Sequence, residues 1–387
     1  MFGVYIHFPY CRKRCPYCDF AVHARARIPH DRYAEKVVAE LEARAPLFAG
    51  RRAHTLYFGG GTPGLWRSDC IAKVVAAVRD RFALGEKAEV TVEANPDDLP
   101  RAQLDGLLAA GVNRLSIGVE SLEPKHLATL GRLHGPNEAV QAVREARAAG
   151  FTNLSLDLMF GLPAQTMVEL ERDLDGLLAL SPEHLSVYNL TVEERTPFFA
   201  LTRSGALKVP DSGLCAEMYE RVMARLAAAG FGHYEISSWA RPGRRAEHNT
   251  LYWTGGEYLG LGCSAASHRR LPGKMGGERF SNVRSVDEWF AAAPGDGEDL
   301  ARDPALGSYE RLDGGALEKE ALWLGLRFLD GLDRARHAAR HGADPLVHHA
   351  GELERLAREG LVTITEDRIR LTPRGVLFAD EVGARLL

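Results

Sequence analysis

Short β-rich runs alternate with longer amphipathic stretches over the first 240 residues, and this alternation limits the fold more than any other feature. Strands are predicted at 3–8, 54–59, 88–94, 114–119, 153–159 and 184–190, and helices at 31–48, 69–82, 100–110, 136–149 and 167–180. Repeated β–α units form a parallel sheet, either open or closed into a barrel, with the helices outside. A chain of 387 residues is long enough for this core, over 1–240, and a smaller second domain.

The rest of the chain has a different pattern. Residues 241–290 close the first unit, and the Gly-, Pro- and Asp-rich segment 291–315 predicts a linker. From 316 to 387, helical patterns at 316–329 and 351–359 precede two short strands within 361–371 and a helix that starts at T-P-R-G. This order predicts a winged-helix-like α+β domain. Such modules often bind DNA, but a fold alone does not determine function. The net charge of -4 does not favour binding to the negatively charged backbone of a nucleic acid. We expect a lid or partner surface.

Three cysteines near the start, Cys11, Cys15 and Cys18, form the pattern C-x3-C-x2-C. One short loop can bring these thiolates to one iron–sulfur cluster, and the fourth iron is then open to a small molecule, since a cubane normally takes four cysteines. The spacing differs from the bacterial ferredoxin run and from paired zinc hooks. A Cys3His zinc site completed by His7 or His23 is the alternative.

Glycines and carboxylates follow four successive predicted strands. They are Gly59 to Pro63, then Glu93 to Pro96, then Glu120, and then Asp157 with Gly161 to Pro163. In parallel β/α folds, ligands bind beyond the carboxyl ends of the strands. Glycines let backbone approach a ligand and carboxylates suit ribose hydroxyls, although a tight turn or a helix cap explains each residue taken singly. The set together predicts a binding site.

Cysteine use and hydropathy indicate where the protein works. Six cysteines of uneven spacing favour a reducing compartment over a disulfide framework, and Cys70, Cys215 and Cys263 are predicted to be small core residues. The first ten residues lack a basic region, and no run approaches the roughly 18 apolar residues of a membrane span. We expect a cytoplasmic protein without a membrane span.

Several motifs, in one order, resemble the radical S-adenosylmethionine (SAM) superfamily and, within it, the family of oxygen-independent coproporphyrinogen III oxidases and related haem chaperones. They are L-Y-F-G-G-G-T-P, V-E-A-N-P, N-R-L-S-I-G-V-E-S-L, L-G-R-L-H and L-D-L-M-F-G-L-P-A-Q-T. The resemblance implies a partial (β/α)6 TIM-like barrel and a 4Fe-4S cluster on the three cysteines. It also implies SAM contacts from Tyr5, Tyr17, Gly60, Gly61, Thr62, Glu93, Glu120, Arg132 and Asp157. The family usually has glutamine at the position of Glu120.

Two features separate the members of this family. The oxidase continues its cluster loop with a further cysteine two residues after the third, where this chain has Phe20. The run H-N-T-L-Y-W at 248–253 resembles the H-N-x-x-Y-W signature that is associated with haem binding in the chaperones. The resemblance implies haem contacts from His248, Asn249, Tyr252 and Trp253, although a lone histidine beside aromatic residues more often belongs to the core.

We therefore expect a haem chaperone that carries the cluster and SAM and passes haem to an acceptor, for which a membrane-associated respiratory protein is a candidate. A radical SAM oxidase that decarboxylates coproporphyrinogen III is the alternative, and radical SAM haem degradation is a third class. Whether the protein is an enzyme stays open, no catalytic residue is assigned, and a monomer or homodimer is expected. His337, His341, His348 and His349 are predicted to lie on a solvated helix face rather than at haem or metal.

Overall fold

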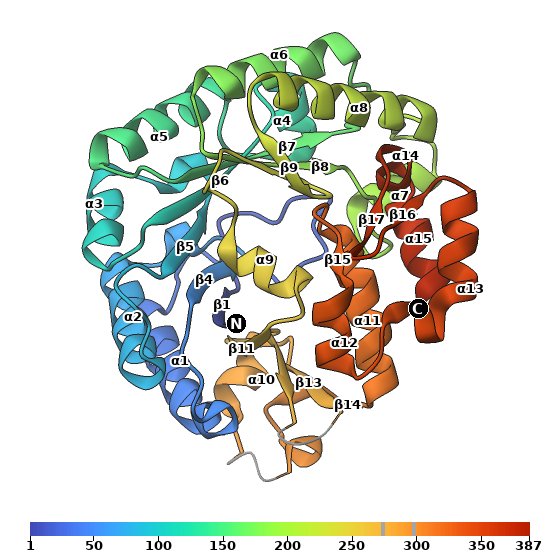
Figure 1. The fold of residues 1–387 in the computed structure, drawn as a ribbon. Coiled ribbons are helices and arrows are strands. Elements are labelled where there is room, and N and C mark those ends of the chain that lie inside the picture. The colour runs from blue at the N-terminus through green and yellow to red at the C-terminus, as the bar shows by residue number, and fades with distance from the viewer. Residues whose placement is uncertain (272–274, 296–298) are drawn as a thin grey trace.

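The computed structural model describes residues 1–271, 275–295 and 299–387 (Figure 1). At its centre is a sheet in which parallel strands follow one another in chain order. These strands are β1 (Phe2–Phe8), β4 (Thr55–Gly60), β5 (Glu89–Ala94), β6 (Arg114–Glu120), β7 (Leu154–Phe160) and β8 (His184–Asn189). Each pairs in parallel with the next. The strands predicted from the sequence are confirmed, and their ends agree within one residue.

Helices connect these strands and lie around the outside of the sheet in Figure 1. They are α1 (His30–Arg44), α2 (Ser68–Phe82), α3 (Arg101–Ala109), α4 (Pro124–Leu130), α5 (Pro136–Ala149) and α6 (Met167–Ala179). The strands are buried along almost their whole length, which is why they appear in the sequence as near-continuous apolar runs. Helix α6 begins with a capping box, in which Thr166 accepts from the backbone N–H of Glu169.

Further strands extend both edges of the sheet. Beside β1 lie β11 (Glu257–Leu261), which is parallel, and the antiparallel β12 (Ala266–Arg270), β13 (Gly277–Asn282) and β14 (Leu306–Leu312). Beside β8 lie β10 (Ser238–Ala240) and β9 (Gly232–Glu235). Within the described residues the outer strands β9 and β14 do not pair with each other, so the barrel is partial, as predicted. The connecting segments carry α7 (Pro197–Arg203), α8 (Ser212–Ala228), α9 (Glu247–Trp253) and α10 (Val286–Ala291).

The prediction of a linker over 291–315 is wrong for its last part. Residues 306–312 form β14, which pairs with β13 in the main sheet. The alternation in L-G-S-Y-E-R-L is weak because this edge strand is mostly exposed, and only Leu312 is buried. Other domain boundaries stay predictions, and 296–298 of the predicted linker lie outside the described residues.

The C-terminal part has the predicted winged-helix-like order. Its elements are α11 (Gly314–Arg327), β15 (Leu332–Asp333), α12 (Arg334–His341), α13 (Pro345–Arg358), β16 (Val362–Ile364), β17 (Arg368–Leu371), α14 (Pro373–Leu377) and α15 (Ala379–Leu386). The short strands form an antiparallel sheet in the order β15–β17–β16. Thr372 caps α14 by accepting from the N–H of Gly375 at 2.9 Å, as the T-P-R-G motif predicted.

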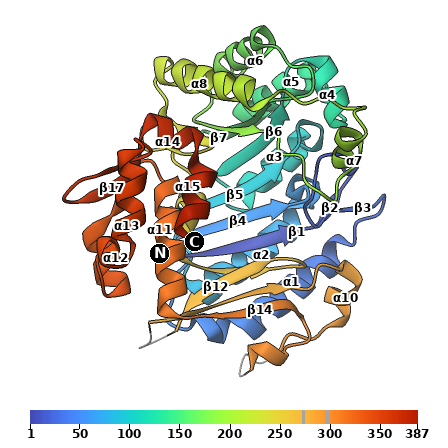
Figure 2. The ribbon, with the colours of Figure 1, turned by 90° about the vertical axis from the view of Figure 1, so that its right-hand side faces the viewer.

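Helix α11 spans the opening between the two edges of the sheet. It follows directly on β14, and at its far end the N–H of Leu329 donates to the carbonyl of Tyr234 on β9 at 2.9 Å. In Figure 2, α11, α12, α13 and α15 lie at the side of the sheet opposite β2 (Tyr10–Cys11) and β3 (His23–Ala24). The C-terminal helices therefore wall off the end of the barrel interior that is remote from the cysteine loop.

The prediction of a solvated histidine face is wrong for His337 and His341. Both are buried because α12 packs against α11 and α13, and their spacing of four residues places them on the same inward face. His337 and His349 approach the buried carboxylate of Glu318 at 3.9 Å, and His348 contacts it at 2.9 Å. Only His348 of these four has a side chain that is mostly in solvent.

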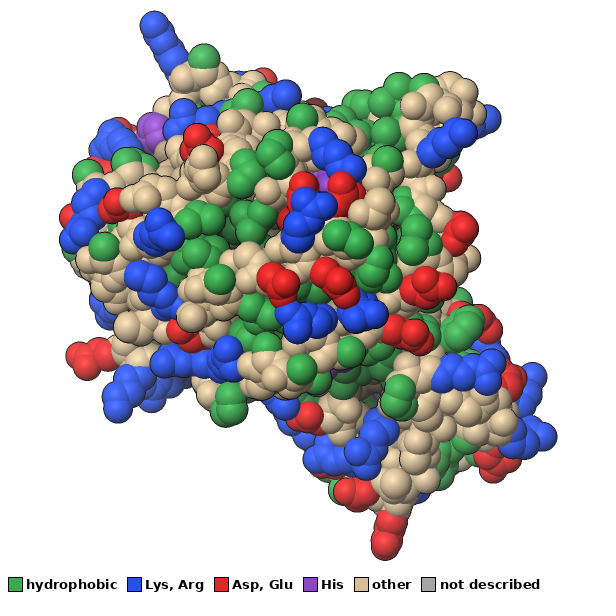
Figure 3. Space-filling model, turned by 90° about the horizontal axis from the view of Figure 1, so that it is seen from above, with side chains coloured by type: hydrophobic (Ala, Val, Ile, Leu, Met, Phe, Trp, Pro, Cys, Tyr) green, Lys and Arg blue, Asp and Glu red, His purple; other side chains and the backbone are tan. Residues whose placement is uncertain are grey.

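Acidic and basic side chains are intermixed on the face seen in Figure 3. This is the ordinary surface of a protein with a net charge of -4. Among the helices of the described residues, none is at once long enough and apolar enough to cross a bilayer.

Candidate functional site

The three cysteines lie at one end of the barrel. Cys11 ends β2, which pairs with β3 and so closes the base of the loop that carries Cys15 and Cys18. Within the loop the N–H of Cys18 donates to the carbonyl of Cys15 at 3.2 Å. The hydroxyl of Thr62, which follows β4, donates to the sulfur of Cys11 at 3.4 Å. The loop is therefore fixed against the carboxyl ends of the parallel strands.

The spacing of the sulfur atoms fits a cluster better than a single zinc ion. Among the described residues only Asp31, Asp69 and Cys70 place three ligand atoms within 4.8 Å of one another, so the three loop sulfurs are spread more widely. Sulfurs bound to one tetrahedral zinc would lie about 4 Å apart, whereas in a cubane each cysteine binds a different iron. His7, one of the fourth ligands considered for zinc, has Nδ1 at 3.2 Å from the Tyr5 hydroxyl and Nε2 at 3.0 Å from the Ala21 carbonyl.

Burial controls the ionisation of Cys11 and Cys18. It raises the pKa of Cys11 to about 11, although the Thr62 hydroxyl opposes the shift, and it raises the pKa of Cys18 as well. These thiols are therefore protonated at neutral pH without a metal. Bound iron must displace the protons, which couples cluster binding to proton release.

A chain of hydrogen bonds links the cysteine loop to three strand ends. The Asn95 amide, after β5, donates to the Thr62 hydroxyl at 3.2 Å, and Arg132 donates to the Asn95 carbonyl oxygen at 2.6 Å. The same guanidinium lies 3.6 Å from the carboxylate of Glu120, at the end of β6. A movement of the cysteine loop would therefore displace Arg132 and change its contact with Glu120.

Three predicted carboxylates lie at neighbouring strands, largely covered but not fully buried. Glu93 accepts from the Tyr57 hydroxyl at 2.6 Å, and Asp157 accepts from the Ser116 hydroxyl at 3.2 Å. Burial raises the pKa of Glu93 and of Glu120 to about 7, and repulsion from Asp157 adds to both shifts. Burial also raises the pKa of Asp157. A positively charged ligand would relieve this concentration of negative charge.

The glycines of the G-G-G-T-P turn are required by the chain itself. A Cβ on Gly60 would lie 2.6 Å from the His7 ring, and the residue has φ +109°. A Cβ on Gly61 would lie 2.8 Å from the carbonyl oxygen of Tyr10 and 2.8 Å from the carbonyl carbon of Pro9. The close approach that the sequence attributed to a ligand is thus already made by the backbone at the start of the cysteine loop.

The two predicted tyrosines lie on either side of this arrangement. Tyr5 is on β1, where it contacts His7 and lines the cavity described next. Tyr17 is in the cysteine loop and packs on Phe198 with a ring separation of 6.1 Å. Burial, with the nearby charge of Glu120, raises the pKa of Tyr17 well above its usual value. Most of the predicted SAM residues lie on the cysteine loop or at and after the ends of β4 to β6, whereas Tyr5 and Asp157 lie at the middle of β1 and β7.

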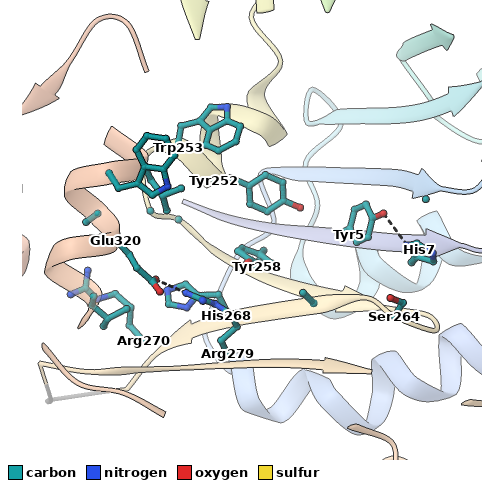
Figure 4. Close-up of a pocket in the computed structure, with 18 of the residues that line it drawn as sticks. Tyr5, His7, Tyr252, Trp253, Tyr258, Ser264, His268, Arg270, Arg279 and Glu320 are labelled. Atoms are coloured by element: carbon teal, nitrogen blue, oxygen red, sulfur yellow. Dashed lines mark hydrogen bonds and ion pairs between the residues drawn. The ribbon is translucent and has the colours of Figure 1, made fainter. Parts of the chain in front are cut away.

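One cavity of about 890 Å³ runs from this site toward the C-terminal helices. Tyr5, Gly60 and Glu93 line it near the cysteine loop, and Tyr252, Trp253, Tyr258, His268, Arg270, Arg279, Glu320, Trp323 and Arg340 line it elsewhere. In Figure 4, Tyr5 and His7 lie toward the arrowhead of β1, while Trp253, His268 and Glu320 lie toward its other end. The barrel interior is thus a ligand-sized chamber with two chemically different ends.

The H-N-T-L-Y-W motif forms α9, and its residues have different surroundings. Tyr252 and Trp253 line the cavity, whereas His248 and Asn249 do not. His248 is 1% exposed, with Nδ1 at 2.8 Å from the Thr55 hydroxyl and Nε2 at 2.8 Å from the Tyr252 hydroxyl. Burial lowers its pKa to about 3. Both ring nitrogens are occupied, so His248 holds Tyr252 in place and offers no free nitrogen to the cavity.

Residues at both ends of the cavity were not predicted from the sequence. Asn95, within the V-E-A-N-P motif, joins Thr62 to Arg132, and the sequence alone gives no indication of this role. The cavity wall on β12 and β13 was not predicted at all. The run S-H-R-R at 267–270 carried a weak signal, because His268 and Arg270 are two residues apart and share one face of a strand.

The partial barrel with a three-cysteine loop at its strand ends defines a protein of the radical SAM class. The model of the radical SAM superfamily matches residues 5–177, and that of the HemN C-terminal domain matches 317–378. The chain is 38% identical to the heme chaperone HemW of Mycobacterium tuberculosis, covering 100% of this chain and 95% of that protein. It is 36% identical to HemW of Bacillus subtilis, covering 100% and 99%. The chain therefore belongs to the HemW family of heme chaperones, as its motifs predicted.

A solved structure agrees with the fold. Coproporphyrinogen III oxidase (HemN) of Escherichia coli, described as a radical SAM enzyme, superimposes with a TM-score of 0.81 at 25% identity. The match covers 100% of this chain and 89% of that one. The partial barrel and the C-terminal domain are therefore shared between the two proteins.

Proposed function

We propose that this protein is a haem chaperone that binds a 4Fe-4S cluster at Cys11, Cys15 and Cys18, binds SAM beside it, and passes haem to an acceptor protein. The observation that carries the proposal is the single cavity with two ends. One end is lined by Glu93, whose charge interacts with that of Asp157, and the other end has aromatic and cationic side chains. Together with the HemW relatives, this arrangement supports separate places for SAM and for haem.

The cluster, when bound, offers one iron without a cysteine ligand, to which the amino and carboxylate groups of SAM can bind. The other roles belong to the chain. Glu93, Glu120 and Asp157 offset the positive charge of SAM, and Arg132 orients Glu120 and Asn95. Glu120 stands where the family usually has glutamine, and it adds one negative charge to this group. The cytoplasmic location, the respiratory acceptor and the oligomeric state stay predictions.

The affinity for SAM should rise with pH. Below pH 7 the carboxyls of Glu93 and Glu120, whose pKa values are about 7, are mostly neutral, and above it they are mostly charged. SAM carries a net positive charge, so the ionised site binds it more tightly, by up to roughly tenfold per pH unit for each coupled carboxyl. Calorimetry on the reconstituted protein at pH 6.0 and 8.0, about one unit either side of the pKa, measures this change.

The Glu120→Gln variant is the matched control for that titration. It restores the residue that the family usually has and removes one titrating group, so the dependence on pH should become shallower while SAM still binds. An affinity that is independent of pH in the parent protein would contradict the placement of SAM against these carboxyls.

The chaperone and oxidase functions are separated by their products. We expect the anaerobically reconstituted protein to bind haem with a distinct Soret band and to release no carbon dioxide from coproporphyrinogen III in the presence of SAM and a reductant. The chain has Phe20 where the oxidases carry an additional cysteine, and this side chain is 67% exposed at the rim of the cavity. Both assays are run on one preparation, with iron content as the control. Catalytic turnover of coproporphyrinogen III would overturn the proposal in favour of the oxidase.

A further inference from the structure

A row of polar side chains crosses the extension of the sheet and faces the cavity. Tyr258 on β11 is directly opposite His268 on β12, and His268 is opposite Arg279 on β13. Arg279 is in turn opposite Glu310 on β14 and pairs with Glu320 of α11. In Figure 4, Tyr258, His268 and Arg279 lie together between the sheet and α11. The side chains of these neighbouring strands therefore form one continuous polar surface.

Two cavity histidines, His268 and His341, have ring nitrogens without hydrogen bonds within the described residues. The His341 ring stacks on His337 with a centroid separation of 4.6 Å, whereas His268 shares one face of β12 with Arg270. His268 is 9% exposed, yet no hydrogen bond to either nitrogen occurs within the described residues, and Nδ1 is fully buried. His7, which also lines the cavity, has both nitrogens engaged, as has His248 behind it. A buried polar group without a partner is costly, and such groups are rare outside functional sites. His268 therefore has the features of a ligand-binding residue.

Two arginines on the same wall have unbalanced charge. Arg270 donates to the backbone carbonyl of Arg340 at 3.1 Å, and Arg340 donates to the carbonyls of Thr254, at 2.8 Å, and Gly255. Within the described residues neither guanidinium has a carboxylate within 4.0 Å.

Neighbouring acids already have other partners. Glu257 is bound by Arg51 at 2.8 Å, and Glu320 pairs with Arg279. The charge of Glu257 reaches both guanidinium groups, but neither forms an ion pair with it. Two half-buried cations without an ion pair of their own favour an anionic ligand, and arginine binds carboxylates in particular.

We propose that this wall is the haem site, with His268 as the axial ligand of the iron and with Arg270 and Arg340 binding the propionates. The inference rests on the proposed haem binding and assigns its place. Tyr252 and Trp253 supply aromatic contacts on one side. The apolar face of α11 supplies Leu317, Ala321 and Leu324, which are spaced by four and three residues along the helix. Histidine is a common axial ligand of haem iron.

The placement predicts that haem and SAM bind together. The carboxylates and the cysteine loop lie toward one end of β1, and His268 lies toward the other (Figure 4). A porphyrinogen oxidised by a SAM-derived radical would instead have to reach the SAM end. Saturating SAM should therefore change the haem affinity by less than about threefold. Displacement of haem by SAM would overturn the separation of the two sites.

The axial ligand is tested by titrating haemin into the parent protein and into His268→Ala. We expect the variant to lose the histidine-ligated Soret position and to bind haemin at least about tenfold more weakly, and added imidazole should restore the spectrum. His341→Ala is the matched control, since His341 also lines the cavity and has an unpartnered Nε2. Circular dichroism and iron content report whether each variant is folded.

The outcomes separate this inference from the proposed function. An unchanged Soret band and affinity in His268→Ala, or loss of the band in His341→Ala alone, would overturn the assignment of the axial ligand. The haem-chaperone proposal would stand in that case. Failure of the parent protein to bind haemin would overturn the proposed function and this placement together.

The propionate contacts are tested with two ligands. Arg270→Gln and Arg340→Gln should each weaken the binding of haemin about tenfold, and they should leave the binding of haemin dimethyl ester, which lacks both carboxylates, unchanged. Arg311→Gln is the control, because Arg311 pairs in register with Glu278 on the opposite face of the sheet and is exposed. Equal losses for haemin and its ester, or no loss for either, would overturn the role of these arginines.

Discussion

Replacing any one of Cys11, Cys15 and Cys18 by alanine is expected to abolish the brown chromophore and the roughly four irons per chain that reconstitution should give. Each thiolate would hold a different iron of the cubane, so two remaining cysteines cannot retain it. The structure also makes each position hard to replace. The sulfur of Cys11 accepts from Thr62 at 3.4 Å, and the guanidinium of Arg132 lies 4.0 Å from the sulfur of Cys15. Absorbance near 400 nm, as an approximate band position, and iron analysis measure the loss.

Cys215→Ala provides the matched control for that experiment. Cys215 is partly buried on α8, and its sulfur is 4.0 Å from the carbonyl of Pro210, outside the cysteine loop. This variant should keep the full iron content. Retention of about four irons in all three loop variants would show that the cluster, if present, is held elsewhere.

The parallel core could be predicted because its sequence signal is strong. Strands such as β4 and β6 are buried on both faces, so they form short apolar runs that stand out between amphipathic helices. The extension of the sheet gives a weaker signal. Strands β12 and β13 carry Arg269, Arg270 and Arg279, which are half-exposed, and only a weak alternation at 267–270 distinguishes them from a loop. They are strands because β1 and β11 offer an edge on which to pair.

The residues of the site also differ in how well the sequence predicts them. Motifs contiguous in sequence, such as the cysteine loop and G-G-G-T-P, could be found because neighbouring residues act together. Arg340 could not be grouped with His268 and Arg270 from the sequence, since it meets them only through the docking of α12 beside β12. His248 illustrates the converse. Its motif was recognised, but only the structure gives both of its ring nitrogens partners, Thr55 and Tyr252.

Gly61→Ala is expected to lower the free energy of unfolding by about 2–3 kcal/mol and to reduce the iron content of the reconstituted protein. The added Cβ would lie 2.8 Å from both the carbonyl carbon of Pro9 and the carbonyl oxygen of Tyr10, and 2.9 Å from the carbonyl oxygen of Phe8. These are backbone atoms at the end of β1, so the clash cannot be relieved by rotating a side chain. The backbone that must move leads directly into Cys11, and for that reason we expect stability and cluster binding to fall together.

Gly351→Ala is the control for the glycine experiment. Gly351 lies within α13, and a Cβ added there would meet no atom from outside its own turn of helix within 4 Å among the described residues. Alanine there should raise the free energy of unfolding by about 0.5–1 kcal/mol through its higher helix propensity. Urea denaturation of both variants, with iron analysis, measures the two effects. If Gly61 were needed only to let SAM come close to the backbone, Gly61→Ala would instead bind SAM more weakly and keep its free energy of unfolding. That outcome would contradict the packing argument and would return the glycine to the ligand-binding role predicted from the sequence.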